Sequence, residues 1–270
     1  RQLGFDSKRE MLVGRFEPAY GLRVPPGLRF GPGLGEVVVI GAGLAGAAVA
    51  EALHRHGLPA LVFEQAPQPA VGASGNPAGL LHGVVHAEDA TYARWYRAAY
   101  LRAAATLAAA VASGHVAGDL GGMLRLEYGS SAAAMRARVS RQGLPADYVQ
   151  VLDADAASAW AGVPLAQPAW CYPHGGWLDP RSVVGHRLAL AGNGLRLATR
   201  VAALAPTHGG RWRLLDAAGV LLAEADHVVL ANAQDAQRLC RAPLGAWQST
   251  RGQISLMPPS AVVGPAPQRP

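Results

Sequence analysis

Short β-branched runs alternate with longer amphipathic segments along much of the chain, most regularly near residue 40. Residues 37–40 (VVVI) and 58–63 are apolar runs typical of buried parallel strands. Between them a glycine-rich turn opens AGLAGAAVAEALHRHG, which has apolar residues at helical spacing. The pattern predicts a strand–helix–strand unit in an α/β fold.

Both periodicities continue downstream. We expect helices over 91–112, 130–141, 154–160 and 180–192, the first capped by Asp89 or Thr91 and the third by Asp153. We expect strands at 123–128, 148–152, 195–205 and 228–230, the last preceded by a hairpin, and a strand followed by a glycine turn over 169–180. Tyr92, Trp95, Tyr96 and Tyr100 form an aromatic stripe at helical spacing, which we expect to pack in the core.

Three glycines follow the first strand at G-x-G-x-x-G spacing, namely Gly41, Gly43 and Gly46. The first permits a sharp turn, the second lets a pyrophosphate approach the backbone, and the third allows close packing of helix on strand. Glu64 lies 18 residues after Gly46, where a carboxylate can accept hydrogen bonds from ribose hydroxyls. The unit therefore predicts binding of FAD or NAD rather than NADP, against the alternative of a glycine turn with only a structural role.

A loop of small residues follows the second strand at 72–79 (GASGNPAG). Ser74 and Asn76 can donate or accept hydrogen bonds there, and the glycines leave backbone N–H groups accessible to a large planar ligand. His82 and His86 are four residues apart, but no third ligand follows them, so we predict no metal site.

Composition narrows the class of protein. The 270 residues are 50% hydrophobic with a net charge of +6, and Lys8 is the single lysine among 24 basic residues. The arginines are scattered, so they agree equally with an anionic partner such as RNA and with a biased genome. No apolar run has membrane-spanning length, no secretory signal is recognisable, and two cysteines form no disulfide framework, so we expect a cytoplasmic protein.

Five separated motifs occur in one order: VVVIGAGLAG, GASGNPAGLL, YPHGGWLDP, VVLANA and RGQIS. Together they resemble the FAD-dependent oxidoreductase domain of the bifunctional enzymes that make 5-methylaminomethyl-2-thiouridine in tRNA. That domain is a flavoprotein of the glycine oxidase and D-amino acid oxidase type. The opening GFDSKREML is similar to the end of the methyltransferase domain that precedes it in those enzymes.

The resemblance implies a Rossmann-like FAD-binding domain interleaved with an α+β antiparallel-sheet substrate domain, with the C-terminal part of the fold missing. Residues 1–16 would be the tail of the methyltransferase domain, and the proline- and glycine-rich residues 17–35 a linker. The FAD-binding domain would comprise residues 36–88 and 178–240. The substrate domain would comprise residues 89–177 and 241–270.

The implied reaction is oxidation of the secondary amine of carboxymethylaminomethyl-uridine at the tRNA wobble position. The flavin would take hydride, and imine hydrolysis would release glyoxylate and leave aminomethyl-uridine. The methyltransferase half, absent from this chain, would then methylate the product with S-adenosylmethionine. Two alternatives stay open: a small amino acid or amine oxidase on the same fold, and a truncated, non-catalytic nucleotide-binding module.

The resemblance also assigns site residues by position. Arg251 and Gln253, with Tyr172, are candidates for positioning the substrate, and an arginine can hold a carboxylate bidentately. A surface arginine at a strand start is the equal alternative for Arg251. Ala233 replaces the glycine that usually ends the second cofactor strand. The FAD-binding residues would be Gly41, Gly43, Leu44, Ala45, Gly46, Glu64, Ala73, Ser74, Gly75, Asn76, Ala78, Gly79, Val201, Ala231, Asn232 and Gly252.

Overall fold

The computed structural model describes residues 35–192 and 194–240, the backbone of residues 2–3 and 10–11, and the single positions 252 and 254. The chain divides into two units, residues 1–34 and 35–270. In the first unit β1 (Gln2–Leu3) pairs antiparallel with β2 (Glu10–Met11). Everything below concerns the second unit.

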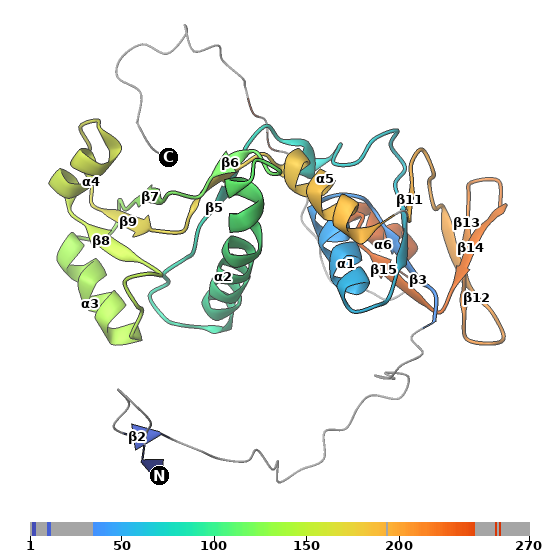
Figure 1. The fold of residues 1–270 in the computed structure, drawn as a ribbon, viewed down its shortest axis with the longest axis horizontal. Coiled ribbons are helices and arrows are strands. Elements are labelled where there is room, and N and C mark those ends of the chain that lie inside the picture. Colours follow the sequence, from blue (N-terminus) through green and yellow to red (C-terminus); the bar gives the residue numbers. More distant parts are fainter. Residues whose placement is uncertain are drawn as a thin grey trace, which may run out of the picture. The chain divides into compact units, whose positions relative to one another are not determined.

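A four-stranded parallel sheet organises this unit (Figure 1). Its order is β11-β4-β3-β15, and the neighbouring strands are parallel throughout. The four strands are β3 (Val37–Ile40), β4 (Ala60–Phe63), β11 (Leu195–Arg196) and β15 (His227–Leu230). A parallel sheet needs cover on both faces, because its strands are apolar on both sides.

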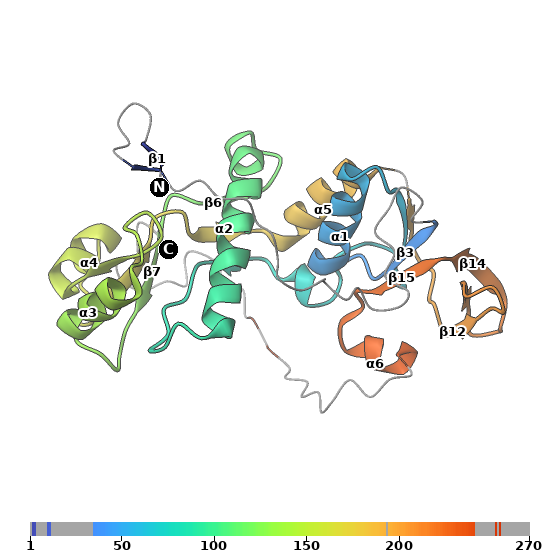
Figure 2. The same ribbon diagram turned by 90° about the horizontal axis from the view of Figure 1, so that it is seen from below.

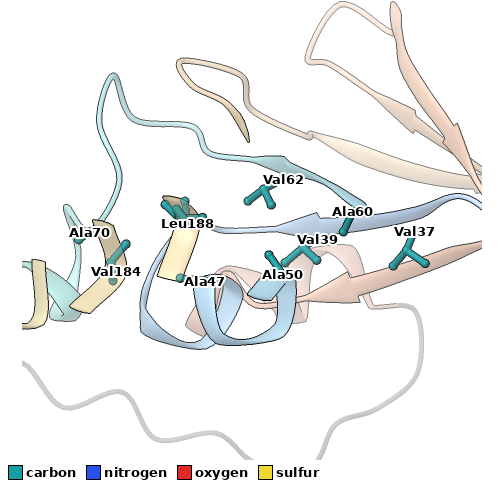
Figure 3. Packing of buried hydrophobic residues seen from close by; sticks show 10 residues of the cluster. Val37, Val39, Ala47, Ala50, Ala60, Val62, Ala70, Val184 and Leu188 are labelled. Atoms are coloured by element: carbon teal, nitrogen blue, oxygen red, sulfur yellow. The ribbon is translucent and has the colours of Figure 1, made fainter. Parts of the chain in front are cut away.

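Helices α1 (Leu44–Arg55) and α5 (Pro180–Ala191) cover one face and lie side by side (Figures 1 and 2). Val37 and Val39 point to that face, where they pack with Ala47 and Ala50 of α1 (Figure 3). The alanines are small enough to bring α1 close to the strands, so the glycine turn between β3 and α1 is held tightly against the sheet.

An antiparallel meander covers the other face of the sheet. It consists of β12 (Ala203–Pro206), β13 (Trp212–Leu215) and β14 (Leu221–Ala225), in that order. Val38 and Ile40, which alternate with the helix-facing valines, pack there with Leu214. The short helix α6 (Ala236–Leu239) contributes Leu239 to the same cluster.

Two further three-stranded sheets, both antiparallel, complete the described structure. One has the order β5-β10-β6 and the other β7-β9-β8. The strands are β5 (Gly79–Leu81), β6 (Gly118–Asp119), β7 (Met123–Leu126), β8 (Gln150–Leu152), β9 (Ala169–Tyr172) and β10 (Gly176–Leu178). The accompanying helices are α2 (Thr91–Ala112), α3 (Ala132–Gln142) and α4 (Ala154–Ala161).

Helix α2 belongs to two hydrophobic clusters. Its middle packs with α3 and β9 through Tyr100, Met135 and Trp170. Its C-terminal half packs with β10 and α5, where Leu107 meets Leu178 and Val183. The helix therefore links the antiparallel sheets to the helix layer of the parallel sheet.

Most elements occur where the pattern predicted them. The strand–helix–strand unit, the hairpin and helix α2 are confirmed, and Asp153 caps α4 by accepting from the Ala156 N–H at 3.0 Å. The predicted cap of α2 is wrong: the N-cap position is Ala90, which has no side-chain acceptor. Asp89 instead forms an ion pair with Arg97, in the second turn of the helix.

The single strand predicted over 195–205 is wrong. The chain leaves the parallel sheet after Arg196 and enters the meander at Ala203. Ala198 lies between them with a φ of 50°, a left-handed conformation that no strand accommodates. The Thr199 N–H then donates to the Glu64 carbonyl at 2.9 Å, which turns the segment back towards the end of β4.

The predicted burial of the aromatic stripe is also wrong for three of its four members. Tyr100 is buried, but Tyr92, Trp95 and Tyr96 are 57%, 73% and 42% exposed. Helix α2 packs instead through the line that begins at Ala93. Trp95 lies two residues beyond Ala93, roughly 200° around the helix, so it points away from that line.

Candidate cofactor site

A cleft of about 190 Å³ lies at the carboxyl ends of β3, β4 and β15. Ligands of open α/β sheets bind at this edge. The cleft brings together eight of the residues predicted from sequence to bind the cofactor: Gly41, Gly43, Glu64, Ala73, Ser74, Val201, Ala231 and Asn232. They come from five segments spread over nearly 200 positions, so the fold has assembled them into one site.

The three motif glycines lie where the structure leaves no room for a side chain. Gly41 has a φ of 105°, and a Cβ there would lie 2.6 Å from the carbonyl oxygen of Ala231. A Cβ on Gly46 would lie 1.8 Å from the carbonyl oxygen of Gly41. A Cβ on Gly43 would lie 2.8 Å from the Ser74 hydroxyl oxygen. Any side chain would therefore push the turn, helix α1 or the 72–79 loop away from the cleft.

The first turn of α1 begins directly after Gly43, which lines the cleft. Gly43 is its N-cap and supplies no side-chain acceptor, and the first turn holds no acidic residue. The Leu44 N–H donates to the Ser74 hydroxyl at 3.0 Å. A helix start with free N–H groups and a positive dipole end suits the phosphates of a dinucleotide.

Glu64 performs a structural task that sequence reasoning missed. Its carboxylate accepts from the Ala42 N–H and from the Ala66 N–H, each at 2.9 Å and each on a different oxygen. The side chain therefore fastens the glycine turn to the end of β4. Because an ionised carboxylate has about four acceptor positions, two remain for ribose hydroxyls.

Asn232 leaves an acceptor in the wall of the cleft. Its Oδ1 is buried and has no hydrogen-bond partner among the residues that the structure describes. A buried acceptor without a donor is costly, so it fits a site completed by a ligand that donates one. The neighbouring Arg238 guanidinium holds the pKa of the Asp235 carboxyl below its usual value, with smaller contributions from Arg200 and Asn232.

Val201 forms the opposite wall of the cleft and is 3% exposed. Its carbonyl accepts from the Arg238 guanidinium at 3.0 Å. Thr199 and Arg200 beside it also line the cleft, as does Asp235. Sequence reasoning missed Thr199 and Arg200 because it assigned residues 195–205 to one continuous strand, and it missed Asp235 because its prediction for this end of the site stopped at Asn232.

The remaining predicted residues lie outside the walls of the cleft. Ala45 and Gly46 continue the first turn of α1 after Leu44, and Gly79 begins β5. Gly75, Asn76 and Ala78 follow Ser74 along the loop. Tyr172 is fully buried in the cluster around Trp170 and does not line the cleft. Gly252 is exposed, and Arg251 and Gln253 lie outside the described residues.

No cluster of three or more histidine, cysteine, aspartate or glutamate side chains suited to a metal ion occurs in the described part of the chain. Within the same residues, none of the helices combines the length and apolarity needed to cross a membrane.

The fold and the cleft are those of a dinucleotide-binding α/β protein. A family model described as FAD dependent oxidoreductase (DAO) matches residues 36–270, and the chain belongs to this family. Membership decides between the two cofactors that the glycine motif left open, in favour of FAD.

Two curated relatives carry the same description, tRNA 5-methylaminomethyl-2-thiouridine biosynthesis bifunctional protein MnmC. The protein from Methylibium petroleiphilum is 41% identical over 258 residues, which cover 93% of this chain and 39% of the relative. The protein from Burkholderia multivorans is 39% identical over 267 residues, covering 97% and 41%. The chain thus spans about two-fifths of the relatives' length, and the resemblance to their FAD-dependent oxidoreductase domain is confirmed.

Among solved structures, the chain resembles glycine oxidase from Geobacillus kaustophilus, with a TM-score of 0.58 and 21% identity. The match covers 76% of this chain and 57% of that enzyme. At this identity the similarity shows the fold, and it confirms the predicted glycine oxidase-like class.

Proposed function

We propose that the chain is the FAD-binding part of an oxidoreductase that removes the carboxymethyl group from carboxymethylaminomethyl-(2-thio)uridine at the tRNA wobble position. The products would be glyoxylate and aminomethyl-uridine. The observation that carries the proposal is the cleft, which gathers eight predicted cofactor residues. Identity near 40% to the bifunctional tRNA proteins over most of the chain supports the choice of substrate.

The residues of the cleft fit FAD. The N–H groups of Ala45 and Gly46 would hold the pyrophosphate at the start of α1, and Glu64 would accept from the ribose hydroxyls. Val201 would meet the adenine through its backbone. The buried acceptor of Asn232 would find its missing donor on the ligand.

Bound FAD supplies the two-electron acceptor for oxidation of the substrate's carbon–nitrogen bond. The chain's own part is to bind and orient. From the sequence pattern, Arg251 and Gln253 stay our candidates for holding the substrate carboxylate, with Tyr172 as a third. We also propose that residues 36–88 and 178–240 form the FAD-binding domain and that residues 89–177 and 241–270 contribute to the substrate domain.

The proposed partners follow from the relatives. Their shared description names tRNA and a bifunctional protein. We propose that this chain acts on tRNA beside a covalently linked methyltransferase domain that uses S-adenosylmethionine, and that it does so in the cytoplasm.

The test is an absorption spectrum of the full-length protein followed by an activity assay. The released cofactor is identified by chromatography, and the protein is then offered tRNA carrying carboxymethylaminomethyl-uridine, free glycine and sarcosine. Near-equimolar FAD with glyoxylate release from the tRNA alone is the expected result. Turnover of glycine or sarcosine without tRNA oxidation would identify a small-molecule amine oxidase. A protein that stays colourless after reconstitution with FAD would be a non-catalytic nucleotide-binding module.

A further inference from the structure

Arg181 makes a contact that neither the glycine motif nor the cleft explains. Its guanidinium donates twice to the carbonyl oxygen of Gly75, from Nε at 2.8 Å and from Nη2 at 2.6 Å. The two residues are 106 positions apart. Among the described residues Arg181 forms no ion pair, so this carbonyl is the identified partner of its guanidinium.

The loop that Arg181 holds is the one that reaches α1. The Gly75 N–H donates to the Gly72 carbonyl at 2.8 Å and closes a tight turn. A Cβ on Gly75 would lie 2.3 Å from the carbonyl oxygen of Ala70, so only glycine allows this closure. Ser74, in the middle of the turn, accepts from the Leu44 N–H. The turn is thus attached to α1 at one side and to Arg181 at the other.

The backbone of Arg181 is itself firmly placed. Asp179 caps α5 and accepts from the Arg181 N–H at 2.9 Å. Val183 and Val184 are buried on the same first turns, and α5 packs along α1. Arg181 therefore fixes the 72–76 loop, which contains only small residues, relative to the helix pair α1 and α5.

We propose that Arg181 is a positioning residue for FAD. By holding the Gly75 carbonyl, it keeps residues 72–76 closed over the start of α1, so that Ser74 and the loop N–H groups are in place before the cofactor arrives. A loop ordered in advance does not have to be ordered on binding, and affinity rises accordingly. The inference rests on the proposed function in one respect, that the cleft takes FAD.

The experiment compares Arg181→Ala and Arg181→Lys with a matched control in the full-length protein. Arg94→Ala is the control, because Arg94 is an exposed arginine of α2 and its replacement removes the same charge as Arg181→Ala. Hydrogen–deuterium exchange of the apoprotein reports on residues 72–76, and fluorescence titration gives the FAD dissociation constant. Arg181 is exposed, so neither substitution disturbs the core.

We expect Arg181→Ala to speed exchange in residues 72–76 while leaving β3 unchanged, and to raise the FAD dissociation constant roughly five- to tenfold, as loss of a charge-assisted hydrogen bond would. Lysine should restore part of both effects. Unchanged exchange in both variants would overturn the proposal, as would equal weakening of FAD binding by Arg94→Ala. If the wild-type protein takes no FAD, the proposed function fails, whereas exchange in the apoprotein still decides whether Arg181 holds the loop.

Discussion

Glu64 offers the sharpest test of how the site is built. The sequence motif assigns its carboxylate to ribose, but in the structure both oxygens already accept backbone N–H groups, from Ala42 and Ala66. Glu64→Gln keeps the shape of the side chain and replaces one acceptor oxygen with a donor NH₂ group. The variant can therefore accept from only one of the two N–H groups.

The structure indicates which N–H loses its partner. Ala42 is completely buried, so its N–H has no access to water, and the glutamine oxygen should turn towards it. Ala66 is only half-buried, and water can replace its lost acceptor. The free energy of unfolding of the apoprotein should then fall by about 1.5–2 kcal/mol, the lower part of the range for a lost hydrogen bond to a charged group. Glu64→Ala leaves the Ala42 N–H without an acceptor as well, and it should lower the free energy of unfolding by about 3 kcal/mol.

Denaturant unfolding of the apoprotein measures these losses separately from cofactor binding. Glu88→Gln is the matched control, because Glu88 is exposed, and it should stay within about 0.5 kcal/mol of wild type. The FAD dissociation constant of Glu64→Gln should also rise about tenfold, since the ribose hydroxyls lose an ionised acceptor. If Glu64→Gln and Glu64→Ala are both as stable as the control, the carboxylate does not fasten the glycine turn and the reasoning is refuted.

Three more predictions follow from the geometry. Gly46→Ala places a Cβ against the Gly41 carbonyl oxygen and should destabilise the apoprotein by on the order of 3 kcal/mol in denaturant unfolding. Ala233→Gly relieves a φ of 51° and should raise the unfolding free energy by about 0.5–1 kcal/mol, and an unchanged or lower value would contradict the strain. Burial raises the pKa of Tyr100 to about 12 and that of Tyr172 further. The free energy of unfolding should stay constant up to about pH 10 and fall between about pH 10 and pH 12, because the unfolded chain loses tyrosine protons there that the folded chain keeps. Denaturant unfolding measured at a series of pH values checks this.

The parts of the site that sequence predicted are those encoded locally. The strand, the glycine turn, helix α1 and Glu64 all fall within 28 consecutive residues, and a Cβ at Gly41, Gly43 or Gly46 would meet an atom within 2.8 Å. Spacing alone therefore predicted the three positions where the turn has no room for a side chain. Such signals do not depend on how the rest of the chain folds.

The parts that sequence missed depend on contacts between distant segments. Thr199 lines the cleft because its N–H bonds to the Glu64 carbonyl, 135 positions earlier, and because Ala198 adopts a left-handed conformation. An alanine carries no sequence signal for such a turn, since glycine or asparagine would be expected there. Likewise, the aromatic spacing of Tyr92, Trp95 and Tyr96 predicted a buried stripe. The buried face of α2 is instead formed by Ala93, Tyr100, Ala104, Leu107 and Ala110.

The arginine-rich composition takes on a different meaning once the contacts are known. Sequence alone left the charge of +6 divided between an RNA partner and genome bias. In the structure Arg181 and Arg238 hold backbone carbonyls around the cofactor cleft, and Arg187 pairs with Glu51 between α5 and α1. Guanidinium groups that already bind carbonyls or carboxylates of the chain have fewer N–H donors left for an anionic partner. Arg181 and Arg238 also stabilise segments that contain small residues. These three arginines therefore stabilise the packing of segments around the cleft, and the case for tRNA rests on the relatives.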